Sequence, residues 1–161
     1  MVENLLTDAL LAFLKDALKE FVLESEESGE RTLRFFEGYL PARESKGDDA
    51  DDDLFPYVLV RPDSGETDQN STMVSISIIV GAYSERSDGY KYAMNVMTRI
   101  RTALCSLPGL VLDGRYQLRF PFKWENYPEQ PYPQWQIDMK TNWLFRTPLP
   151  VPPNHGENFY E

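Results

Sequence analysis

The sequence contains one cysteine and one histidine among 161 residues. A lone Cys105 cannot close an internal disulfide bond, which agrees with a reducing compartment. His155 lies among prolines in a predicted tail, where it cannot act as the oriented base of a triad or supply a two-histidine metal site. A phosphate-binding glycine loop of either common spacing is also missing. We therefore expect no catalytic residues, no metal site and no cofactor, and hence no enzyme.

Long apolar runs and basic charge are also scarce. No stretch approaches the roughly 18 consecutive apolar residues of a membrane span, and no basic flank precedes the first apolar stretch. We expect a soluble protein without a signal peptide or a membrane partner. The 16 Lys and Arg residues are outnumbered by 26 Asp and Glu residues, which gives a net charge of −10. Such a chain is poorly suited to neutralise phosphates, so specific nucleic-acid binding is not expected.

The charge is unevenly divided along the chain. Residues 1–90 carry 20 acidic and 8 basic side chains, a balance of −12, whereas residues 91–161 carry 6 acidic and 8 basic, a balance of +2. Unlike charges at two ends can orient a subunit against a second copy of itself, although solubility alone is the simpler explanation. The candidate residues for self-association are Arg99, Arg101, Arg115 and Arg119, with ordinary surface charge as the alternative.

Apolar spacing predicts a helix over residues 5–23 and a second helix with a buried seam, and it indicates an extended segment over residues 33–40. The seam comprises Tyr90, Ala93, Met97, Ile100, Leu104 and Leu107. Cys105 lies beside this seam and is expected to be a small buried thiol. Pro108 and Gly109 are expected to end the second helix.

The apolar run over residues 55–60 predicts a short strand, and alternation of apolar and polar residues predicts strands over residues 73–83, 116–122 and 135–145. The first two are expected to form a hairpin with a loop of about eleven residues, in which Pro62, Asp63, Ser64 and Gly65 supply turn chemistry. The expected fold class is α+β: a mainly antiparallel four-stranded sheet with two helices packed on one face, in the order α-β-β-α-β-β. We expect one domain over residues 1–146 and a proline-rich, extended or disordered tail over residues 147–161.

An acidic run over residues 44–53 contains six acids and one lysine and is expected to form a solvated loop. Its aspartates are Asp48, Asp49, Asp51, Asp52 and Asp53. Three of them have the alternate spacing that opens a calcium-binding EF-hand loop, but Leu54 stands where that loop needs glycine and Val60 where it needs glutamate. A tight calcium site is therefore not expected.

Residues 121–135 combine aromatic rings with four prolines. A stiff aromatic loop can present side chains to a partner at low entropic cost. The candidate partner-binding residues are Phe122, Trp124, Tyr127 and Tyr132. The alternative is that the rings fold back over the sheet edge and complete a small core.

Three segments carry a resemblance to a known family: FPYVLVRP at 55–62, GAYSERSDGY at 81–90, and KWENYPEQPYPQW at 123–135 followed by TNW at 141–143. Over roughly residues 33–146 the chain resembles tail terminator, or tail completion, proteins of long-tailed bacteriophages and prophages. The resemblance implies a small α/β subunit that forms a ring, commonly a hexamer, on the end of the tail tube. Such a ring stops tube growth and offers a docking surface for the head.

The implied partners are other copies of the chain, the tail tube protein, and a head-completion or neck protein. The implied location is the tail or neck of the virion, after assembly in the bacterial host cytoplasm. Alternatives are another head–tail connector, a host adaptor protein, or an enzyme whose site is not recognised. As a further hypothesis, the acidic loops line the lumen of the ring and repel DNA during its passage.

Overall fold

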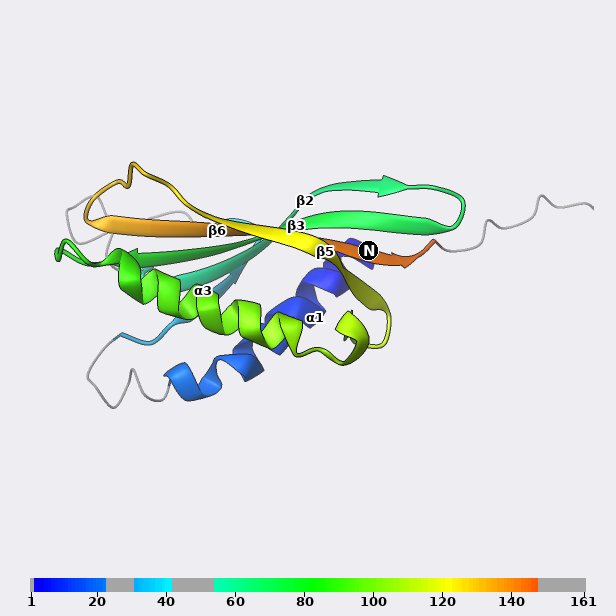
Figure 1. Cartoon of the computed structure of the whole chain (residues 1–161), viewed down its shortest axis with the longest axis horizontal. Helices are drawn as coiled ribbons and strands as arrows, with labels where there is room; N and C mark the ends of the chain where they lie inside the picture. Colours follow the sequence, from blue (N-terminus) through cyan, green and yellow to red (C-terminus); the bar gives the residue numbers. More distant parts are fainter. Residues whose placement is uncertain (1, 23–30, 42–53, 148–161) are drawn as a thin grey trace, which may run out of the picture.

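The computed structural model describes residues 2–22, 31–41 and 54–147. In this part of the chain, six strands form one mixed sheet that curls into a half-barrel, in the order β1-β2-β3-β6-β5-β4. Figure 1 shows helices α1 and α3 below this sheet. The expected fold class is wrong, because the sheet has six strands rather than four and one pair of strands is parallel.

The strands are β1 (Arg34–Glu37), β2 (Tyr57–Thr67), β3 (Ser71–Tyr83), β4 (Val111–Leu112), β5 (Tyr116–Asn126) and β6 (Gln134–Arg146). The helices are α1 (Val2–Ala17), α3 (Tyr90–Cys105) and the 3-10 helix η1 (Pro108–Leu110), and residues 19–22 are helical again after a turn at Leu18. Strand β1 pairs in parallel with β2, and all other pairs are antiparallel. A four-residue strand is too short to show alternation, and a parallel partner has no local sequence signal.

The β2–β3 hairpin is longer than expected. Its turn lies at residues 68–70, whereas Pro62 and Gly65 belong to β2, where the register shifts between Pro62 and Ser64. A proline fits there because strand β1 ends opposite Val60. No described strand lies beside Pro62 on this outer edge to accept a hydrogen bond from the N–H group that proline lacks. The carboxylate of Asp68 accepts hydrogen bonds from the backbone N–H groups of Asn70 and Ser71, both at 2.7 Å, and these bonds fix the actual turn.

The main core lies between the sheet and both helices. Helix α1 contributes a stripe of leucines that is fully buried, namely Leu6, Leu10 and Leu14. The predicted seam of α3 is confirmed at Ala93, Met97, Ile100 and Leu104, whereas Tyr90 is exposed. Both helices pack on the face of the sheet to which Val74, Ile76, Ile78 and Val80 of β3 belong. Helix α3 contacts β3 and β6, and helix α1 contacts β2 and β1, so burial of these apolar stripes is what holds the helices on the sheet.

Two polar groups inside this core are hydrogen-bonded. The hydroxyl of Thr141 on β6 donates to the carbonyl oxygen of Ile76 at 3.0 Å, and the indole N–H of Trp143 donates to the Thr141 hydroxyl at 2.8 Å. Trp143 is completely buried. The threonine therefore lets a buried indole keep a partner without access to water.

A second apolar cluster lies on the opposite face of the sheet. It contains Leu54, Phe55, Tyr57, Leu59 and Ile79. Ile79 belongs to this cluster, so the odd-numbered positions of β3 do not all face water at this end of the strand. Neither helix within the described ranges is long and apolar enough to cross a membrane.

Candidate interaction surface

Three aromatic residues follow one another at alternate positions on strand β5, and we call Phe120, Phe122 and Trp124 the aromatic strip. Trp124 is paired with Met139 of the core, so the strip belongs to the helix side of the sheet. The rings of Phe120 and Phe122 stack with their centroids 5.7 Å apart. Phe120 is 62% exposed and Trp124 is 42% exposed, whereas Phe122 is partly buried against the core.

The aromatic strip lies on a strand with a largely open edge. Strand β4 pairs with β5 at only two positions, Tyr116 and Gln117. Beyond Gln117, no strand in the described part of the chain pairs with the outer edge of β5. The backbone N–H and C=O groups on such an edge can pair with a strand of another chain.

The loop between β5 and β6 is held by its own hydrogen bonds. The side-chain nitrogen Nε2 of Gln130 donates to the backbone carbonyls of Tyr127 and Gln136, each at 3.0 Å. Tyr127 donates its hydroxyl to the carboxylate of Asp138 at 3.0 Å. This bond to a carboxylate, together with partial desolvation, raises the pKa of Tyr127 above its usual value of 10.0. The loop is therefore tied to the beginning of β6.

The far end of the same loop is fastened to the segment that leads into α3. Tyr132 donates its hydroxyl to the carbonyl of Glu85 at 2.6 Å, and the indole N–H of Trp135 donates to the carbonyl of Ser84 at 2.9 Å. The indole also lies against Gly89, where any Cβ atom would overlap it. Part of the aromatic segment thus folds back on the segment before α3, while the ring of Tyr132 remains 60% exposed.

The basic residues predicted for self-association do not form one group. The Arg99 guanidinium lies 5.0 Å from the ring centre of Phe21, and that of Arg115 lies 5.3 Å from the ring centre of Tyr116. Arg101 is exposed on α3, whereas Arg119 is exposed on β5, next to the aromatic strip. Only Arg119 and the neighbouring Lys123 therefore lie on the open sheet edge.

The expectation that Cys105 is a buried thiol is wrong. Cys105 is exposed, because it lies one position beyond the seam residue Leu104, and a helix turns about 100° per residue away from the core. The acidic-loop residues Asp48, Asp49, Asp51, Asp52 and Asp53 lie outside the described residues, as does the tail from 148 to 161.

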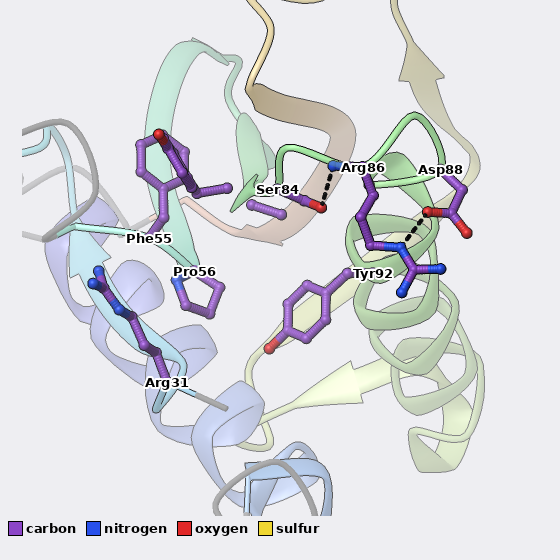
Figure 2. A pocket seen from close by; sticks show the side chains of 10 residues that line it. Arg31, Phe55, Pro56, Ser84, Arg86, Asp88 and Tyr92 are labelled. Atoms are coloured by element: carbon purple, nitrogen blue, oxygen red, sulfur yellow. Dashed lines mark hydrogen bonds and ion pairs between the residues drawn. The ribbon is translucent and has the colours of Figure 1, made fainter. Parts of the chain in front are cut away.

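A pocket of about 560 Å³ lies between the start of β2, the end of β3 and the start of α3. Figure 2 shows the side chains that line it. Pro56 and Tyr92 face each other across it. Arg86 donates to the carboxylate of Asp88 at 3.2 Å on its rim, and Arg31 enters from the segment before β1. The lining mixes apolar rings with two arginines and one carboxylate, that of Asp88, which Arg86 already holds. Within the described ranges, no group of three His, Cys, Asp or Glu side chains could hold a metal ion.

Comparisons with known proteins add little. No family model matches the chain, and no curated protein matches it. One solved structure, whose name states no function, aligns over 89% of this chain and 97% of its own, with 12% sequence identity and a TM-score of 0.47. At this level of similarity, no conclusion about function follows from it.

Proposed function

We propose that this chain is a structural subunit that forms a ring on the end of a bacteriophage tail tube, ends tube growth and offers a surface for head attachment. The observation that carries the proposal is the β5 edge, where unpaired backbone groups, exposed aromatic rings and two basic side chains occur together. A subunit that acts by assembly needs such a surface, whereas an isolated domain gains nothing from exposing it.

The positions of the three segments that resemble tail terminator proteins support this proposal. They meet at one end of the sheet: Gly81 lies against Tyr57, and Trp135 and Tyr132 donate to Ser84 and Glu85. Segments that are far apart in the sequence therefore come together at this end of the sheet. The partners we propose are further copies of the chain, the tail tube protein and a head-completion or neck protein, all within the tail or neck of the virion.

The first test is the state of the purified full chain. Native mass spectrometry over a range of concentrations, with negative-stain microscopy of the same samples, is expected to show one closed assembly, and the resemblance favours six copies. A chain that stays monomeric and turns over a small substrate would contradict the proposal and support the alternative of an unrecognised enzyme.

The second test separates a tail terminator from another connector. The proposed partner, a tail tube protein, is polymerised with and without this chain, and tube lengths are measured by electron microscopy. We expect shorter tubes of uniform length, with the chain labelled at one end. Rings that leave the tube-length distribution unchanged would place the protein elsewhere in the neck.

A further inference from the structure

Within the described residues, the sheet has two open edges, and they lie on its opposite sides. One is the β5 edge beyond Gln117. The other is the outer edge of β2 beyond Val60, where strand β1 stops and no other described strand continues the sheet. We call the hairpin segment from Arg61 to Ser77 the arm. Figure 1 shows its tip projecting beyond both helices, and residues 63–70 are exposed.

The directions of the strands let these two edges pair. Strands β2, β3, β6 and β5 are successive antiparallel neighbours, so β2 and β5 run in opposite directions. A second copy, placed beside the first without being inverted, would therefore bring its β2 alongside β5 as an antiparallel neighbour. A pair of subunits joined in this way keeps one free β2 edge at one end and one free β5 edge at the other. The same contact can therefore repeat until the rotation closes a ring.

The charges on the two edges are complementary. The first part of the arm, from Arg61 to Asp68, has one basic and three acidic residues, a balance of −2. Strand β5 with the preceding residue, 115–126, has three basic residues and one acidic residue, a balance of +2. The register places Glu66, Arg119 and Lys123 on the same face, away from the helices, because their cross-strand partners are Met73, Asn142 and Lys140 on that face. In a continued sheet, side chains of unlike charge would lie on neighbouring strands.

The helix side of the two edges also fits. There β5 presents the large rings of the aromatic strip, and β2 presents Pro62 and Gly65. A glycine on an edge strand leaves room that an aromatic ring from the next strand can cover. Large rings against small residues would bury the strip without overlap.

Each edge is interrupted by a proline at a register shift, Pro62 on β2 and Pro121 on β5. Prolines and bulges on edge strands limit pairing with unrelated strands. A contact between these edges is therefore short and depends on side chains for its specificity.

We propose that one copy of the chain adds the open edge of its β5 to the outer edge of β2 in the arm of the next copy, so that each subunit uses two different surfaces. This inference rests on the proposed function, since it names the contact that builds the ring. Arg119 and Lys123 then face the arm's Glu66, and the aromatic strip covers Pro62 and Gly65.

Thiol cross-linking tests the pairing directly in the full chain. In a background with Cys105→Ser, Glu66→Cys and Lys123→Cys are made as separate proteins and treated with a short bismaleimide. We expect cross-linked dimers only when the two proteins are mixed, because the contact joins unlike surfaces. Lys91→Cys on α3 replaces Lys123→Cys as the control and is expected to give no cross-link with Glu66→Cys.

Charge reversal gives an independent measurement. Arg119→Glu with Lys123→Glu is expected to lower the association constant by about tenfold or more, because two cross-strand attractions become repulsions. Lys91→Glu is the matched control and should leave association unchanged. Circular dichroism of the isolated subunit checks that the reversed variant is folded.

The possible outcomes separate this inference from the proposed function. Lys123→Cys cross-linking to itself would indicate a two-fold contact and overturn the inference, as would a monomer at every concentration. A closed ring without the Glu66–Lys123 cross-link would overturn the inference and leave the ring proposal intact. Cross-links in the mixture with open chains instead of rings would support the contact and contradict the proposed function.

Discussion

Gly81 of β3 lies directly beneath the phenol ring of Tyr57, its cross-strand neighbour on β2. A Cβ atom at position 81 would overlap the ring itself, which packs in the second cluster between Phe36 and Phe55. The glycine is therefore required by the close approach of an aromatic side chain, in the middle of a strand where glycine otherwise weakens the sheet.

We predict that Gly81→Ala lowers the free energy of unfolding by about 1–3 kcal/mol, because the added methyl group forces Tyr57 out of its place. Chemical unfolding at a fixed protein concentration measures this change. Gly65→Ala is the control, since a Cβ atom added at position 65 would have its nearest atoms at 3.4 and 3.6 Å, which is ordinary van der Waals contact. Equal effects of the two substitutions would show that Tyr57 is not the cause.

The turn of the β2–β3 hairpin makes stability depend on acid pH. Hydrogen bonds from the backbone N–H groups of Ser71 and Asn70 lower the pKa of Asp68 below its usual value of 3.8. Because the folded pKa is the lower one, this contribution is fully present above about pH 4 and is lost as the pH falls through the folded pKa. Asp68→Asn should remove this part of the acid dependence, as measured by unfolding at several pH values. Asp8→Asn on α1 serves as the control, and an unchanged acid limb in Asp68→Asn would contradict the prediction.

The fastening of the β5–β6 loop predicts a local effect at position 135. Trp135→Phe keeps an aromatic ring but leaves the Ser84 carbonyl without its 2.9 Å hydrogen bond. We expect a loss of about 1 kcal/mol in stability, with faster hydrogen exchange over residues 84–89. Trp124→Phe, on the exposed strip, should change stability by less than about 0.5 kcal/mol. Unchanged exchange over residues 84–89 in Trp135→Phe would mean that the bond does not hold the segment.

The aromatic strip predicts a variant that folds but does not assemble. Phe120→Ser with Trp124→Ser removes two exposed rings, so the unfolding of the isolated subunit should change little. Association should weaken because these rings would be buried between copies. Native mass spectrometry gives the measurement, and Leu5→Ser, at another exposed apolar residue, is the matched control. Normal assembly of the double variant would exclude the strip from the contact.

Periodicity predicted the elements with long regular patterns. The seam of α3 and the buried side of β3 were correct at Met97, Ile100, Ile76 and Ile78, because both elements are long enough for their period to be counted. The parallel pairing of β1 was missed, since Arg34 meets Tyr57 through the tertiary fold alone. The turn was misplaced because proline and glycine at a strand irregularity look like turn residues, and Asp68 was the better signal.

The candidate surface was predicted only in part. The alternation that predicts a strand over residues 116–122 places Phe120 on the same face as Leu118, two residues before it. Leu118 is buried and Phe120 is exposed, because alternation tells which face a side chain occupies and not whether another element covers it. The sequence indicated Trp124 as a candidate surface residue. It could not reveal the open edge of β5, because alternation does not tell which strands lie beside each other.

The contact between Trp135 and Gly89 has an evolutionary consequence. These two residues are separated in the sequence by helix α3, the 3-10 helix η1 and strands β4 and β5. A Cβ atom at position 89 would overlap the indole, so position 89 cannot gain a side chain while Trp135 keeps its place. Among descendants of a common ancestor, a bulkier side chain at position 89 should be accompanied by a smaller one at position 135. The same coupled substitution is expected at positions 81 and 57, and it would trace this lineage after overall sequence similarity has faded.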